Sequence, residues 1–153
     1  MAVFEKIEVA FMATVRQILD IKGHDVFAVH PDDTVFDALR LMDKKNIGAV
    51  VVKDGDDLAG VFTERHYARK VFLKGRSSPQ TPIRDVMETK VIHVGPNETA
   101  EACLALMSRK KIRHLPVLHD GQVVGVISIG DLMRSIIAEH KFDIDQLVGY
   151  VRG

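Results

Sequence analysis

The sequence contains Val29-His-Pro-Asp-Asp-Thr-Val-Phe-Asp-Ala-Leu-Arg-Leu-Met42 and, 65 residues later, Val94-Gly-Pro-Asn-Glu-Thr-Ala-Glu-Ala-Cys-Leu-Ala-Leu-Met107. The two stretches align without gaps, and the same shift continues along the chain. Further pairs in this register are Ile47 and Ile112, Val52 and Val117, Gly60 and Gly125, Thr63 and Ser128, and Arg69 and Arg134. A single register that persists from residues 29 and 94 to residues 69 and 134 indicates an internal duplication.

Each copy has the pattern of a strand, a helix, two strands and a closing helix. Thr34 and Thr99 are predicted helix N-caps, because a threonine oxygen can accept an otherwise unpaired backbone N–H. Asp37, three residues after Thr34, is placed to complete a capping box. Apolar residues then recur at helical spacing. They are Val35, Ala38, Leu39 and Met42 in the first copy, and Ala100, Cys103, Leu104 and Met107 in the second.

The second half of each copy predicts a β-hairpin and a closing helix. Turn residues, such as Asp120-Gly121, separate two apolar strands and favour a tight hairpin turn. The predicted strands span residues 26–29, 49–52 and 58–62 in the first copy, and 91–94, 115–118 and 123–127 in the second. The closing helices are expected over about residues 64–73 and 129–140.

These elements predict an α/β (α+β) chain made of two repeats. The expected parts are an N-terminal extension (1–13), a first repeat (14–76), a polar linker that contains two prolines (77–82), a second repeat (83–140) and a C-terminal tail (141–153). The tail is expected to form a terminal helix over Ile144–Val151. Because one repeat is too small to bury its sheet well, we expect the two to pack sheet against sheet with pseudo-twofold symmetry.

The composition excludes several classes of protein. The 153 residues carry 21 Lys+Arg and 21 Asp+Glu, and a net charge of zero argues against a general nucleic-acid surface. The single cysteine, Cys103, excludes an intrachain disulfide and a cysteine-based zinc cluster, and it is expected in the core. No apolar run approaches the roughly 18 to 20 residues of a membrane span, and the N-terminus does not resemble a secretory signal. We therefore expect a cytoplasmic protein with no membrane or nucleic-acid partner.

The sequence offers no case for catalysis. It has no phosphate loop, dinucleotide fingerprint or nucleophile elbow, and nothing pairs a nucleophile with a base. The seven histidines are not spaced as metal ligands. We therefore predict a non-enzyme without a metal or a catalytic cofactor.

The middle strand and the strand-to-helix junction of each copy carry a family resemblance. The second copy has Ile112-Arg-His-Leu-Pro-Val117 and Gly125-Val-Ile-Ser-Ile-Gly-Asp-Leu132, matched by Ile47-Gly-Ala-Val-Val-Val52 and Gly60-Val-Phe-Thr-Glu-Arg-His-Tyr67. Over about residues 14–140 the chain resembles a tandem CBS-domain pair, the Bateman module. That resemblance implies an adenine nucleotide, such as AMP, ADP, ATP, NAD or S-adenosylmethionine, in each of two clefts between the repeats. It also implies a homodimer formed through helices 35–45 and 100–110 or through the closing helices.

Carried over to the second copy, the resemblance assigns Ser128 to the phosphate and Asp131 to the ribose hydroxyls. It places Arg113, His114 and Pro116 along the adenine. The physical chemistry agrees, because a hydroxyl at a helix N-terminus favours an anion and a carboxylate can accept two ribose hydroxyl hydrogens. The structural alternative for Ser128 and Asp131 is a helix cap with a first-turn acid, which stabilises by about 1 kcal/mol and binds nothing.

The first copy departs from this pattern. Thr63 keeps the hydroxyl, but His66 replaces the aspartate, and a neutral imidazole accepts only one hydrogen bond. The following segment is basic, with five cations against one acid over residues 64–76. We therefore hypothesise that Arg65 and Arg69 contact the phosphates of a larger ligand, such as NAD or ATP. The alternative for both arginines is a solvated helix face.

The leading functional hypothesis is a stand-alone pair that senses an adenine nucleotide, AMP first and NAD or ATP as alternatives. It would signal in trans to an unknown protein partner, with the nucleotide shifting the population of one arrangement of the repeats. The alternative is a structural or protein-interaction module in which one or both clefts bind no nucleotide.

Overall fold

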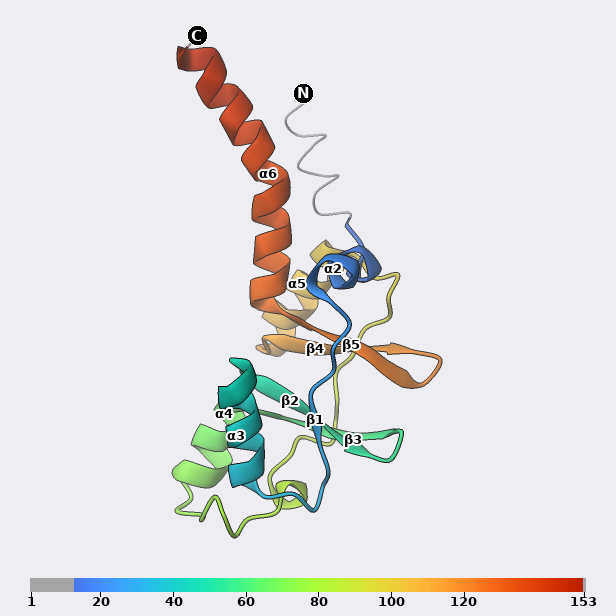
Figure 1. Ribbon diagram of the computed structural model, residues 1–153, viewed down its shortest axis with the longest axis vertical. Helices are drawn as coiled ribbons and strands as arrows, with labels where there is room; N and C mark the ends of the chain where they lie inside the picture. The colour runs from blue at the N-terminus through green and yellow to red at the C-terminus, as the bar shows by residue number, and fades with distance from the viewer. Residues whose placement is uncertain (1–12, 153) are drawn as a thin grey trace. The chain divides into compact units, whose positions relative to one another are not determined.

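The computed structural model describes residues 13–152 and shows a mixed α/β chain with two small sheets (Figure 1). The predicted fold class is therefore confirmed. The chain divides into two compact units, one of residues 25–92 and 120–124 and the other of residues 1–24, 93–119 and 125–153. Residues 1–12 of the expected N-terminal extension lie outside the described residues. The packing of one sheet on the other remains a prediction.

The unit that holds the first repeat is built on a three-stranded sheet in the order β1-β2-β3. Its elements are β1 (Ala28–Val29), α3 (Val35–Lys45), β2 (Ala49–Asp54), β3 (Asp57–Thr63), α4 (Glu64–His66), η1 (Tyr67–Phe72) and η2 (Ile83–Asp85). The predicted capping box of α3 is confirmed: Asp37 N–H donates to Thr34 Oγ1, and Thr34 N–H donates to the Asp37 carboxylate. The core of this unit includes Val35, Val52 and Phe62, all fully buried.

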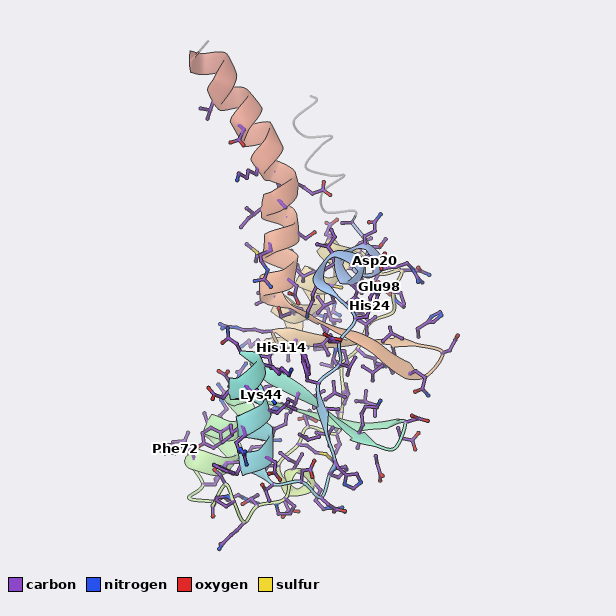
Figure 2. The ribbon with its side chains drawn as sticks, viewed as in Figure 1. Asp20, His24, Lys44, Phe72, Glu98 and His114 are labelled. Carbon is purple, nitrogen blue, oxygen red and sulfur yellow. The ribbon has the colours of Figure 1, made fainter. Side chains whose placement is uncertain are left out.

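The closing segment of the first repeat is not the regular α-helix predicted over residues 64–73. Only Glu64–His66 is α-helical, and η1 is a π-helical turn, in which Leu73 N–H donates to the Ala68 carbonyl five residues back, at 3.0 Å. Val71 is fully buried, whereas Phe72, which is labelled in Figure 2, is 69% exposed. The apolar run Val71-Phe72-Leu73 has no helical periodicity, so the pattern could not distinguish a π turn from an α turn.

The second repeat provides α5 (Ala100–Lys110), β4 (His114–His119), β5 (Gln122–Ser128) and α6 (Ile129–Arg152). The Asp120-Gly121 turn has φ of 52° and 77°, the two positive values that a type I′ hairpin turn requires. Cys103 is fully buried on α5, as predicted for a core residue. Among the described helices, α6 included, none is long and apolar enough to cross a membrane.

The C-terminal part of the chain differs from the prediction. A single helix, α6, runs from Ile129 to Arg152, where the sequence predicted one helix ending near residue 140 and another over Ile144–Val151. The stretch His140-Lys-Phe-Asp-Ile144 contains neither glycine nor proline, so nothing in it stops a helix.

The strand predicted at residues 91–94 is also wrong, because only Val94 makes a bridge, to Val117. In the first repeat, Val51 N–H donates to the Phe27 carbonyl at 3.1 Å and helps to hold β1 against β2. The residue that matches Val51 is Pro116, which has no N–H to donate. The second repeat therefore loses a ladder hydrogen bond at that position, and the predicted strand shrinks to an isolated bridge.

The segment that begins each repeat packs in the unit of the other repeat. Thr14, at the N-cap of α2 (Val15–Lys22), bridges to Thr99 at the N-cap of α5. In the same way Pro82, before η2, bridges to Thr34 at the N-cap of α3. As a result α2, at the start of the first repeat in sequence, contacts α6 of the second.

Candidate functional site

The strand-to-helix junction of the second repeat is a reciprocal cap. Ser128 ends β5, and its N–H donates to Asp131 Oδ2 at 2.8 Å. In return, Asp131 N–H donates to Ser128 Oγ at 3.1 Å. Ile129 N–H, the first of α6, donates to the Arg113 carbonyl at 2.9 Å. The structure thus brings three of the predicted site residues together at the start of α6 and fixes the carboxylate of Asp131 there.

Asp131 also pairs with two cations that the sequence reasoning missed. Lys22 Nζ, at the end of α2, donates to Asp131 Oδ2 at 2.6 Å and to the Val126 carbonyl. Arg134 Nη2 donates to Asp131 Oδ1 at 2.6 Å. The Asp131 side chain is only 5% exposed, whereas Arg134 is 74% exposed. The one sequence signal for these partners was the match of Arg134 to Arg69 across the repeat.

These contacts keep Asp131 ionised. Burial raises the pKa of Asp131 and is the largest single effect, but the hydrogen bonds from Lys22 and Ser128 and the positive charge of Lys22 together outweigh it. The net pKa is therefore lowered below its ordinary value. At neutral pH the start of α6 presents a buried carboxylate with the charge that a ribose acceptor needs.

The first repeat builds the same cap with a histidine. Thr63 N–H donates to His66 Nδ1 at 3.1 Å, and His66 N–H donates to Thr63 Oγ1 at 3.2 Å. With Nδ1 as the acceptor, the neutral ring carries its proton on Nε2. Burial lowers the pKa of His66 most, and the charges of Lys70 and Arg65 lower it further, against an opposing effect of Glu88. The single acceptor of this imidazole is thus already used by the helix cap.

The remaining predicted residues are distributed over the two units. Arg65 and Arg69 are exposed on α4 and η1, in the same segment as His66. Arg113 is exposed just before β4, and His114, the first residue of β4, is half-buried. Pro116 is buried within β4, and its carbonyl already accepts from Val94 N–H at 3.1 Å.

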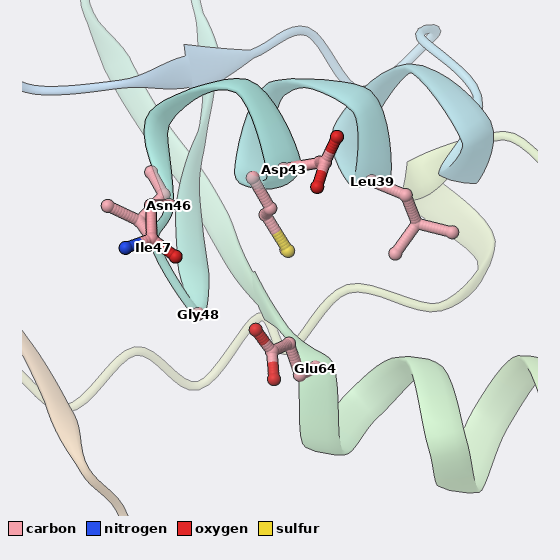
Figure 3. A pocket seen from close by; sticks show the side chains of 7 residues that line it. Leu39, Asp43, Asn46, Ile47, Gly48 and Glu64 are labelled. Carbon is pink, nitrogen blue, oxygen red and sulfur yellow. The ribbon is translucent and has the colours of Figure 1, made fainter.

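A shallow hollow of about 350 Å³ lies in the first-repeat unit beside α3 and the start of α4 (Figure 3). It is lined by Leu39, Met42, Asp43, Asn46, Ile47, Gly48 and Glu64. None of the predicted nucleotide-binding residues lines it. Among the side chains that the structure describes, no three His, Cys, Asp or Glu residues gather as a metal site.

Comparison with known proteins agrees with this architecture. A family model described as the CBS domain matches residues 15–72 and 83–138. The mitochondrial CBS domain-containing protein CBSX3 of Arabidopsis thaliana is 43% identical over 127 residues, which are 80% of this chain and 62% of that relative. The CBS domain-containing protein YhcV of Bacillus subtilis is 34% identical over 75% of this chain and 81% of its own length. This chain therefore spans less than two thirds of CBSX3 and most of YhcV.

A solved structure is similar as well. A protein with CBS domains from Burkholderia ambifaria MC40-6, described provisionally as a signal-transduction protein, is 49% identical with a TM-score of 0.80. The match covers 82% of this chain and 95% of that chain. CBS-domain pairs generally bind adenine nucleotides and act in regulation or signalling, not in catalysis. With both repeats matched, this chain belongs to the CBS-domain family as a tandem CBS pair.

Proposed function

We propose that the chain is a non-catalytic regulatory module that binds AMP at the start of α6 and signals in trans to a partner protein. The observation that carries this proposal is the Asp131 carboxylate, which is buried, ionised and fixed beside Ser128 at the start of a long helix. The proposal keeps the cytoplasmic location expected from the sequence.

The chemistry of the junction suits a nucleoside monophosphate. Ser128 Oγ accepts from Asp131 N–H, so the hydroxyl proton of Ser128 is available to a phosphate oxygen. The positive end of the α6 dipole favours the same anion. Asp131 supplies the acceptor for ribose. Arg113, an exposed residue whose carbonyl accepts from Ile129 N–H, lies beside the helix start, where contact with the base is expected.

The first repeat favours phosphate over ribose. Its cap offers the Nε2–H donor of His66 and no second acceptor, because Nδ1 is occupied by Thr63 N–H. Arg65 and Arg69, both exposed residues, follow in the same segment. This arrangement supports the hypothesis that the first repeat contributes cations to the phosphates of a larger ligand, such as NAD or ATP.

Titration calorimetry with AMP tests the assignment of the site. Asp131→Ala is expected to weaken AMP binding at least tenfold, since a hydrogen bond to a charged group contributes about 1.5 to 3 kcal/mol. Glu101→Gln removes an exposed carboxylate from the first turn of α5 and serves as the matched control. Arg65→Ala tests the first repeat with NAD and ATP. AMP binding that is unchanged in Asp131→Ala shows that the assignment is wrong.

A homodimer is part of the proposal. Ile129, Met133 and Ile137 recur every four residues on α6 and are 38%, 45% and 57% exposed. An exposed apolar stripe on the closing helix supports pairing with a second copy. Size-exclusion chromatography with light scattering is expected to give twice the 17.0 kDa mass of the chain. A clean monomer contradicts the dimer.

One observation favours the alternative of a purely structural or interaction module. The cap acceptors are used internally in both repeats, by Thr63 N–H in the first and by Ser128 N–H, Lys22 and Arg134 in the second. Thermal shift against AMP, ADP, ATP and NAD separates the two functions. A ligand at 100 times its dissociation constant stabilises by about 2.7 kcal/mol, so the absence of any shift favours the structural module.

A further inference from the structure

We infer that Arg134 is the residue by which the Ser128–Asp131 site distinguishes a phosphorylated nucleoside from an unphosphorylated one. This inference rests on the proposed function, because it concerns the same site. It assigns to Arg134 an exchange of partners, from the carboxylate of Asp131 to the phosphate of the ligand.

The hydrogen bonds of Asp131 show where a ribose can bind. A carboxylate has about four acceptor positions, two on each oxygen. Oδ2 receives Lys22 Nζ at 2.6 Å and Ser128 N–H at 2.8 Å, which fill both of its positions. Oδ1 receives Arg134 Nη2 at 2.6 Å. One ribose hydroxyl therefore fits on Oδ1 beside Arg134, and both hydroxyls fit there only when Arg134 has left.

The two cations differ in how firmly they are held. Lys22 Nζ has two partners, Asp131 and the Val126 carbonyl, and its side chain is 34% exposed. The Arg134 side chain is 74% exposed, and its hydrogen bond to Asp131 is partly buried. Because the Arg134 side chain lies mostly in water, its guanidinium group can exchange Asp131 for another anionic partner at modest cost. Arg134 is thus the exchangeable partner, and Lys22 stays to balance the buried charge after the exchange.

Arg134 already lies beside the position expected for the phosphate. A Cβ built on Gly130 would stand 3.3 Å from Arg134 Nη1 and 3.6 Å from Ser128 Oγ, so both groups lie over the first turn of α6. A guanidinium group binds phosphate with two parallel hydrogen bonds and needs only side-chain rotation to do so. The phosphate of AMP therefore gives Arg134 a new anionic partner as the ribose takes its place on Oδ1.

Adenosine offers no such compensation. Its second ribose hydroxyl must compete with Arg134 for Oδ1, and the displaced guanidinium group gains only water. The arrangement therefore favours AMP over adenosine in two ways. Arg134 attracts the phosphate of AMP, and it holds a position on the Asp131 carboxylate against a ligand that has no phosphate. Arg134→Gln removes both effects.

Calorimetric titration of the full chain with AMP and with adenosine tests this inference. Arg134→Gln is expected to weaken AMP binding about ten- to hundredfold, the loss of a charge-assisted hydrogen bond, and to leave adenosine binding equal or tighter. Arg109→Gln removes the same charge from an exposed position of α5 and is expected to leave both affinities unchanged. Arg134→Lys keeps the charge without the planar fork and is expected to fall between wild type and Arg134→Gln.

The outcomes separate this inference from the proposed function. If wild type binds AMP and Arg134→Gln keeps the wild-type ratio of AMP to adenosine affinity, the role of Arg134 is wrong and the proposed function stands. Equal losses for both ligands contradict the role in the same way, because they indicate a general effect on the site. If wild type binds neither AMP nor adenosine, AMP sensing itself is wrong and the assignment of Arg134 falls with it.

Discussion

Replacing Lys22 by Met tests the electrostatic design of the second repeat directly. The change removes the ammonium group that donates to Asp131 Oδ2 and to the Val126 carbonyl, and it keeps an unbranched side chain of similar reach. Asp131, only 5% exposed, cannot recover the lost hydrogen bond from bulk water. We therefore expect a loss of stability at neutral pH.

The size of that loss follows from the burial of the pair. Removing one partner of a fully buried ion pair costs about 3 to 5 kcal/mol, and a hydrogen bond to a charged group contributes about 1.5 to 3 kcal/mol. Lys22 is 34% exposed, and Asp131 keeps its hydrogen bonds from Ser128 and Arg134, so the lower range applies. We expect the free energy of unfolding to fall by about 2 kcal/mol and Tm to fall by about 4 to 8 °C.

The loss depends on pH in a predictable direction. The pKa of Asp131 lies below its ordinary value of 3.8, so its ionised form stabilises the fold above that pH. This contribution is lost as the pH falls through the lower pKa of the folded state. Removing Lys22 raises the pKa of folded Asp131, so the deficit of Lys22→Met is full at neutral pH. The deficit shrinks as the pH falls through the pKa of Asp131 in the variant.

Urea denaturation at pH 7 and at a series of lower pH values measures the stability deficit of Lys22→Met and its dependence on pH. Lys44→Met, which removes an exposed ammonium from α3, is the control and is expected to stay within about 0.5 kcal/mol of wild type. If Lys22→Met is as stable as this control at pH 7, the ion pair does not stabilise the fold. A deficit that stays constant on acidification would show that it does not arise from the charge of Asp131.

Three further predictions concern single residues. Gly60→Ala is expected to destabilise the fold by about 2 kcal/mol, because the new Cβ would stand 2.7 Å from the Glu88 carbonyl oxygen. The matched Gly125→Ala would meet only a leucine side chain, so it is expected to cost less. Equal losses of the two variants in urea denaturation would contradict this difference. His66, whose pKa is lowered below 6.5 mainly by burial, contributes stability that is lost as the pH falls below that value. His66→Asn, which retains a cap acceptor but does not titrate, is expected to lose less stability on acidification, and identical pH profiles of unfolding show that His66 is not responsible. Burial and Glu98 raise the pKa of the Cys103 thiol to about 11, so a thiol reagent at about pH 8 is expected to react far more slowly with the folded chain than with the urea-unfolded chain, and similar rates would place the thiol at the surface.

The 65-residue register predicted most of the fold because local rules repeat with it. The caps at Thr34 and Thr99 and the Asp120-Gly121 turn depend on neighbouring residues, which a sequence displays directly. The predictions that were wrong depend on more than residue type. Pro116 reads as an apolar strand residue in the repeat alignment, yet its missing N–H is what reduces the predicted strand at residues 91–94 to one bridge. The pattern of apolar residues alone does not indicate whether a strand residue has a backbone N–H to donate.

The candidate site was predictable in part for the same reason. The pairs Ser128 with Asp131 and Thr63 with His66 lie three residues apart, so their mutual contact is local and visible in the sequence. Lys22 is separated from Asp131 by 109 positions, and only the folded chain shows that α2 carries it there. The sequence could therefore name the acceptor carboxylate but not the cation that holds it.

Because the segment that begins each repeat packs with the opposite repeat, neither repeat contains its complete core when the chain is cut at the repeat boundary. A fragment from residue 83 onward lacks α2 and with it Val15, Ile18 and Leu19, three buried side chains of the unit that holds the second repeat. A fragment that stops before residue 81 lacks Ile83 and Val86, which belong to the core around the first sheet. Each unit therefore completes its core with residues that lie on the other side of the repeat boundary in the sequence, so the two repeats are expected to fold as one chain and not as separable fragments.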